Sequence, residues 1–123
     1  MEDHRLSTLF DYTKFHIGLY ATLITGLFAV VAFVESHKRD LAGLVQLLPY
    51  AKWTACLILI AGAAGGAIAS NIPNFREFES FSRAKLEVFG IRFLRYSQLA
   101  HVEHLAFWSA IGVATYALLS FSI

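Results

Sequence analysis

The chain has 123 residues, which is enough for one domain. Hydrophobic residues make up 57% of it and charged residues 15%, against about 45–50% and about 25% in soluble domains. The net charge of +1 lacks the basic excess of a general nucleic-acid binder, so no nucleic-acid partner is expected. The single cysteine, Cys56, cannot form an internal disulfide. These totals favour a small integral membrane protein.

The first apolar segment covers residues 15–34 and carries one ionisable residue, His16, near its start. Its length matches the roughly 20 residues that a helix needs to cross the hydrocarbon core. It is too long, and the residues before it are too mixed in charge, for a cleavable signal peptide, so we expect it to be retained. Small residues recur every fourth position at Gly18, Thr22 and Gly26, which lets another helix approach closely.

A charged run at residues 35–40 marks a loop outside the membrane. Residues 41–48 are apolar, but together with the next segment they exceed one crossing, so we place them along the interface. Lys52 sets the boundary because a lysine costs about 2.5–3.5 kcal/mol at the bilayer centre, whereas at the edge its ammonium reaches water. The second span is therefore predicted over residues 53–72, with Pro49 opening its helix.

The second span is the predicted packing centre of the protein. Its second half consists almost entirely of small residues. Gly62 and Gly66 form a GxxxG pair, and Gly65 repeats this spacing with Ala69. Since such residues let two backbones come close in lipid, we expect these glycines to contact other helices.

The segment at residues 75–99 is the only long charged one. On a helical wheel its apolar residues share one face and its charged residues the other, which predicts an amphipathic helix at the membrane interface. The phenylalanines predicted to lie in that interface are Phe75, Phe78, Phe81, Phe89 and Phe93.

The third span is predicted over residues 105–123. Three spans put the N-terminus and residues 71–104 on one side, together with most of the ten Lys and Arg residues; only Lys38, Arg39 and Lys52 lie on the other side. The positive-inside rule then predicts a cytoplasmic N-terminus and an outside C-terminus. We predict an all-α integral membrane protein of a prokaryotic inner or plasma membrane, with three transmembrane helices and a cytoplasmic-side interfacial helix.

Ionisable side chains gather at the predicted inner boundary. His101 and His104 share a helix face, and Asp11 and His16 lie at the same depth on the first span. Imidazole and carboxylate groups are ligands for zinc and other transition metals, and His16 with either of the other histidines could ligate a haem. The spacing is not diagnostic, and hydrogen bonds to headgroups, water or Glu103 are the alternative interpretation. No cofactor is assigned.

The sequence contains no phosphate-binding glycine loop and no G-x-S-x-G nucleophile motif, so an enzyme is not the favoured function. We expect a homo-oligomer in the lipid bilayer that acts as a pore, a channel or a membrane-permeabilising effector. Its subunits are expected to meet chiefly through Gly62 and Gly66 and secondarily through Gly18, Thr22 and Gly26. Two alternatives remain open. One is an accessory subunit of a larger membrane complex, and the other is a membrane-embedded metal- or haem-binding protein that uses the inner-face histidines.

Overall fold

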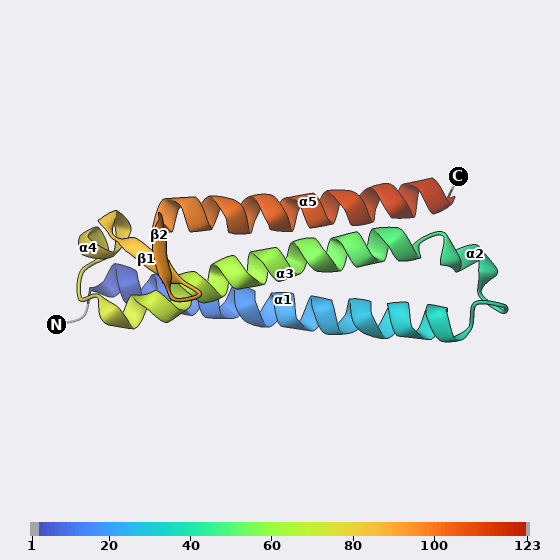
Figure 1. The fold of residues 1–123 in the computed structure, drawn as a ribbon, viewed down its shortest axis with the longest axis horizontal. Coiled ribbons are helices and arrows are strands. Elements are labelled where there is room, and N and C mark those ends of the chain that lie inside the picture. The colour runs from blue at the N-terminus through green and yellow to red at the C-terminus, as the bar shows by residue number, and fades with distance from the viewer. Residues whose placement is uncertain (1–2, 123) are drawn as a thin grey trace.

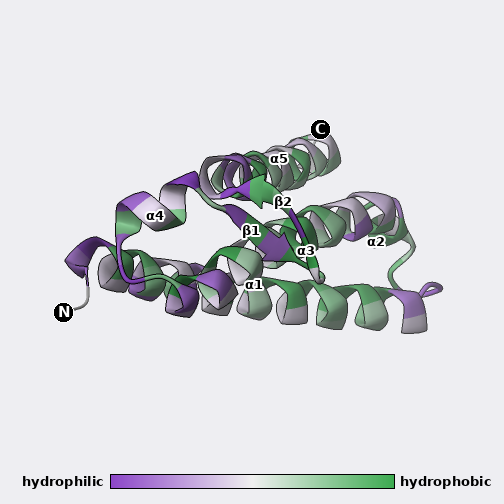
Figure 2. Cartoon of the chain, turned by 60° about the vertical axis from the view of Figure 1, so that its left-hand side comes forward, coloured by the Kyte–Doolittle hydropathy of each residue, from purple (hydrophilic) through white to green (hydrophobic). Residues whose placement is uncertain are grey.

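Three long helices form the body of the protein in this computed structural model, which describes residues 3–122 (Figure 1). They are α1 (His4–Ser36), α3 (Leu48–Asn71) and α5 (Tyr96–Ser122). Each is long and apolar enough to cross a membrane. Figure 2 shows apolar residues along the middle of the bundle and hydrophilic residues gathered near its ends.

The predicted spans fall on these helices, and the helices are longer than the spans. Residues 15–34 lie within α1, and residues 53–72 lie within α3 except for Ile72, which begins a 3-10 turn. Residues 105–123 lie within α5 except for Ile123, which is outside the described residues. The three-helix part of the predicted fold is therefore confirmed by length and composition.

The connection between α1 and α3 contains a short helix, α2 (Ala42–Val45), in the stretch that was predicted to lie along the interface. Pro49 lies in the first turn of α3, as predicted, where its missing N–H costs no hydrogen bond. Lys52 Nζ lies 2.8 Å from Glu35 Oε1 and so joins the start of α3 to the end of α1. Both side chains are well exposed, so this pair adds little stability.

Helix α3 is the centre of the bundle. In an apolar stretch of 18 residues of α3, 44% of the residues are buried, compared with 11% in the corresponding stretch of α1 and 17% in that of α5. Both α1 and α5 pack against it. The prediction that the second span is the packing centre is therefore confirmed.

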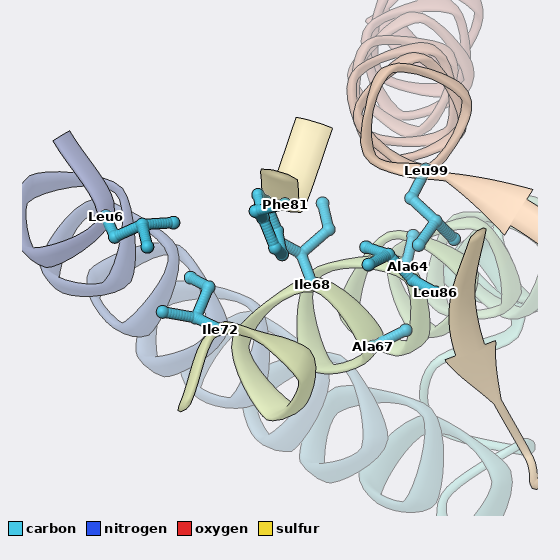
Figure 3. Packing of buried hydrophobic residues seen from close by; sticks show 8 residues of the cluster. All are labelled: Leu6, Ala64, Ala67, Ile68, Ile72, Phe81, Leu86 and Leu99. Atoms are coloured by element: carbon cyan, nitrogen blue, oxygen red, sulfur yellow. The ribbon is translucent and has the colours of Figure 1, made fainter. Parts of the chain in front are cut away.

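A small cap covers one end of the bundle. It consists of the 3-10 turn η1 (Ile72–Asn74), helix α4 (Phe78–Arg83) and an antiparallel hairpin of β1 (Lys85–Val88) and β2 (Ile91–Arg95). Figure 3 shows its core, in which side chains from the long helices meet those from α4 and β1. The core residues are Leu6, Ala64, Ala67, Ile68, Ile72, Phe81, Leu86 and Leu99.

The predicted interfacial helix over residues 75–99 is wrong. The chain reverses direction at Phe89 and Gly90, whose φ angles are +53° and +82°. Before this turn, Leu86 is buried between the exposed residues Lys85 and Glu87, which is the two-residue period of a strand. The apolar pattern fits both periods, and packing on α3 selects the hairpin.

The phenylalanines predicted to share one face are separated by this fold. Phe81 is fully buried in the cap core, and Phe75 and Phe78 pack against that core. Phe89 and Phe93 lie on the hairpin and are 90% and 51% exposed. Three of the five are therefore structural, and two face outward.

Polar contacts hold the cap on the helices. The Asp3 carboxylate caps α1 by accepting the Arg5 N–H at 2.9 Å, and its other oxygen accepts the Phe78 N–H at 2.9 Å. At the other side of the cap, the Asn71 amide donates to Glu87 O at 2.9 Å and accepts the Glu87 N–H at 3.0 Å. Asn71 thus pairs with β1, at the point where the register of the hairpin shifts, as a neighbouring backbone would.

Candidate functional site

Two glycines on α3 make room for side chains from both neighbouring helices. A Cβ atom at Gly65 would lie 3.5 Å from Glu103 Oε1 and 3.5 Å from Ile17 Cγ1. A Cβ atom at Gly62 would lie 4.0 Å from the Tyr20 side chain. Both glycines were predicted as packing residues, and their partners belong to the same chain.

The space beside these glycines holds a buried polar pair. The Tyr20 hydroxyl, on α1, donates a hydrogen bond to Glu103 Oε1, on α5, at 2.8 Å. Tyr20 is 1% exposed and Glu103 4%. The Tyr20 ring also lies 5.4 Å from that of Phe107, between ring centroids. The bond joins the two outer helices across α3.

Glu103 lies on the buried stripe of α5. The other buried residues of this stripe are Leu99, Ala106, Ala110 and Ala117. Together with Glu103 they recur at steps of three, four or seven residues, which is the period of one helix face, so Glu103 faces the bundle. Sequence reasoning missed this because it placed Glu103 just before the third span, among interfacial histidines. The phase of the alanines was the signal that could have found it.

The arrangement can act as a polar clamp. Within residues 3–122 Glu103 has no ion-pair partner, and the Tyr20 hydroxyl is the hydrogen-bond donor that its carboxyl has. A buried carboxyl that loses its donor pays the cost of desolvation without compensation. The pair therefore holds α1 and α5 in one register across the glycines of α3.

The predicted metal set is not assembled. Among residues 3–122 no group of three or more His, Cys, Asp or Glu side chains could hold a metal ion. Nδ1 of His16 lies 2.8 Å from Tyr12 O, and Nδ1 of His101 lies 2.6 Å from Ser97 O, so each ring bonds to its own helix. Asp11 and His104 are exposed. The cross-helix bond is made by Glu103 instead of the histidines.

The small-residue face of α1 has a different environment from that of α3. Gly18 and Gly26 are exposed, and a Cβ atom at either would meet nothing within 4 Å. The Thr22 hydroxyl between them donates to Gly18 O at 2.9 Å. A shallow groove runs along this face, lined by Asp11, Lys14, Phe15, Gly18, Leu19 and Thr22.

Gly66, the second member of the predicted GxxxG pair, also has nothing within 4 Å of a Cβ atom. It lies half-buried in a shallow groove between α3 and the hairpin. Gly62 and Gly66 therefore do not share one role, since only Gly62 contacts another helix.

Comparisons of the chain with protein-family models, curated proteins and solved structures found no match.

Proposed function

We propose that this chain is an integral membrane protein that crosses the bilayer three times and assembles into a homo-oligomer through the outer face of α1. The observation that carries this proposal is the contrast between the two small-residue faces. Cβ atoms at Gly62 and Gly65 would meet side chains of other helices of the chain, whereas Cβ atoms at Gly18 and Gly26 would meet nothing within 4 Å. A surface that permits close approach is thus left facing the surroundings.

The physical argument comes from how helices associate in lipid. Lipid supplies no hydrophobic drive, so association depends on van der Waals contact and hydrogen bonds, and small residues allow both. Glycine inside a helix is less stable than alanine by about 0.5–1 kcal/mol. Alanine would fit at Gly18 and Gly26 within one subunit, so a contact with a second subunit is what makes glycine useful there.

A pore or a membrane-permeabilising assembly needs a ring, and a ring needs two unlike faces on each subunit. The groove along α1 is one such face. The other is the outer face of α5, where Leu105 is 72% exposed and Trp108 66% exposed. Bulky side chains of α5 packing into the α1 groove of the next subunit would form the ring. Contact of α1 with α1 alone would stop at a dimer.

The oligomer is tested with three proteins: the natural chain, Gly26→Leu and the control Gly43→Leu. Gly43 is also exposed with nothing within 4 Å, but it lies in α2, outside the long helices. We expect Gly26→Leu to reduce the mass in mild detergent to that of a monomer and to abolish ion flux into liposomes. Gly43→Leu should keep both. A natural chain that is monomeric and conducts nothing contradicts the proposal and favours an accessory subunit.

The orientation follows from charge. The cap and the start of α1 carry most of the Lys and Arg residues, so we propose that this end is cytoplasmic. Cysteines introduced at Ser36 and Ser82, in a chain lacking Cys56, should be labelled from outside and inside respectively by a membrane-impermeant reagent. The reversed pattern contradicts the orientation, and labelling from one side contradicts the spanning arrangement.

A further inference from the structure

The hairpin turn presents apolar side chains to the surroundings. Phe89 is 90% exposed, Ile91 63% and Phe93 51%. Because Phe89 and Gly90 both have positive φ angles, the two-residue turn needs residues such as Asn-Gly or Gly-Gly. A phenylalanine at φ +53° is strained. The chain therefore keeps a large exposed ring at a position where the backbone disfavours it.

The turn lies beside α3 instead of beyond its end. Phe89 and Val88 line a shallow groove together with Ala63, Gly66 and Ser70 of α3. Figure 1 shows the hairpin lying across α3, with its turn directed toward the body of the bundle. The turn with Phe89 therefore lies beside a helix that is apolar enough to cross a membrane.

The depth of the turn follows from contacts between the helices. At Gly65, next to Gly66, a Cβ atom would lie 3.5 Å from Ile17 Cγ1 of α1. Ile17 belongs to the apolar stretch that begins at Phe15. The turn is thus level with the first residues of the apolar stretch, where a bilayer has its boundary between headgroups and acyl chains.

Basic side chains accompany the apolar turn. Lys85, Arg92 and Arg95 are exposed on the two strands, and Glu87 lies opposite Arg92 as the one acidic residue of the hairpin. Segments that bind anionic lipid surfaces typically place aromatic side chains below the headgroups and basic side chains at the level of the headgroups. The long basic side chains can reach phosphates while the rings lie deeper.

We propose that this hairpin is a lipid anchor. Its turn inserts Phe89, Ile91 and Phe93 between the headgroups and acyl chains of the bilayer that surrounds the three helices, and its basic residues contact anionic headgroups. The proposal rests on the proposed membrane insertion. Lipid fits better than water because Phe89, Ile91 and Phe93 are apolar and exposed, while Leu86 of β1 is already packed in the cap core.

The test measures the depth of nitroxide labels on the full chain with Cys56→Ala, in vesicles of phosphatidylcholine and phosphatidylglycerol. Labels are placed one at a time at Phe89→Cys and Phe93→Cys. The references are Glu79→Cys on exposed α4 and Phe28→Cys in the middle of α1. Accessibility to oxygen reports lipid, and accessibility to a water-soluble nickel chelate reports water. We expect labels at 89 and 93 to be protected from nickel and accessible to oxygen, at a depth between the two references.

Nickel accessibility at 89 equal to that at 79 overturns the anchor, and so does protection from both probes, which means that protein covers the turn. In either result, a label at position 28 that is accessible to oxygen and protected from nickel shows that membrane insertion itself stands. Nickel accessibility at 28 overturns insertion and anchor together. Phe89→Asn, which suits the turn, separates folding from anchoring. In that variant we expect the label at 93 to move toward nickel accessibility while the label at 28 stays unchanged.

Discussion

The small-residue faces of α1 and α3 look alike in sequence and differ in the structure. Gly65 of α3 has Glu103 and Ile17 within contact distance of a Cβ atom, whereas Gly18 and Gly26 of α1 have open space. Regular spacing of small residues shows that a helix can be approached closely. It does not show whether the approaching surface comes from the same chain. The structure assigns Gly62 and Gly65 of α3 to internal packing and leaves the face of α1 open.

The largest expected effect separates these faces directly. Gly65→Leu places a large side chain where Glu103 and Ile17 already lie, and overpacking of this kind costs about 1–3 kcal/mol or more. Gly26→Leu should not destabilise the monomer and should stabilise it slightly, because leucine is a better helix former than glycine and a Cβ atom there meets nothing within 4 Å. Unfolding of both variants in mixed micelles with increasing dodecyl sulfate measures this. Equal loss in the two would contradict the difference between the faces.

A second prediction concerns the polar clamp beside Gly65. Tyr20→Phe removes the donor and leaves the Glu103 carboxyl buried without it, which we expect to cost about 1 kcal/mol of unfolding free energy. Tyr116→Phe, on the exposed side of α5, is the matched control and should cost less. Glu103→Leu and the double variant complete a double-mutant cycle. If the loss of unfolding free energy in the double variant equals the sum of the losses in Tyr20→Phe and Glu103→Leu, the two residues are not coupled.

A third prediction is that acid weakens the attachment of the cap before it affects the three long helices. The Phe78 N–H, followed by Arg5, holds the pKa of the Asp3 carboxyl at about 2, below its ordinary value of 3.8. A lowered folded pKa means that the contribution to stability is complete above the unfolded value and is lost as the pH falls from about 4 to about 2. The protection factor of the Phe78 amide, which is its exchange rate relative to the intrinsic rate at each pH, should fall over this range. Asp3→Asn should remove this change in the protection factor while amides in the middle of α3 stay protected.

The smallest expected effect is a stabilisation. Gly18→Ala adds a methyl group to open space, so helix propensity should stabilise the monomer by about 0.5–1 kcal/mol. Gly65→Ala has the same gain in helix propensity, but its methyl group would lie 3.5 Å from the buried Glu103 carboxyl and from Ile17, so its stabilisation should be smaller. Unfolding of both variants under monomeric conditions gives the comparison. Destabilisation by Gly18→Ala in the monomer would mean that α1 has an internal contact on this face.

Several features could be predicted from the sequence because they depend on local composition. A long uncharged apolar run has few alternatives to a membrane-crossing helix, so residues 15–34 and most of 53–72 fall on the observed helices. The central position of α3 followed from its concentration of small residues. These properties do not require knowledge of what lies next to the helix in space.

The rest depended on contacts between distant segments. The apolar residues within 85–95 fit a helical and a strand pattern, and the pairing of Asn71 with Glu87 and the burial of Leu86 in the cap core select the hairpin. The metal prediction treated the histidines as neighbours because they share a depth, but depth does not fix direction around a helix. Tyr20 and Glu103 are 83 residues apart, and only the packing of α1 and α5 on the glycines of α3 brings them together. Composition and period thus determined that three helices form and suit lipid, whereas tertiary packing decided which small residues are filled from within and which remain open.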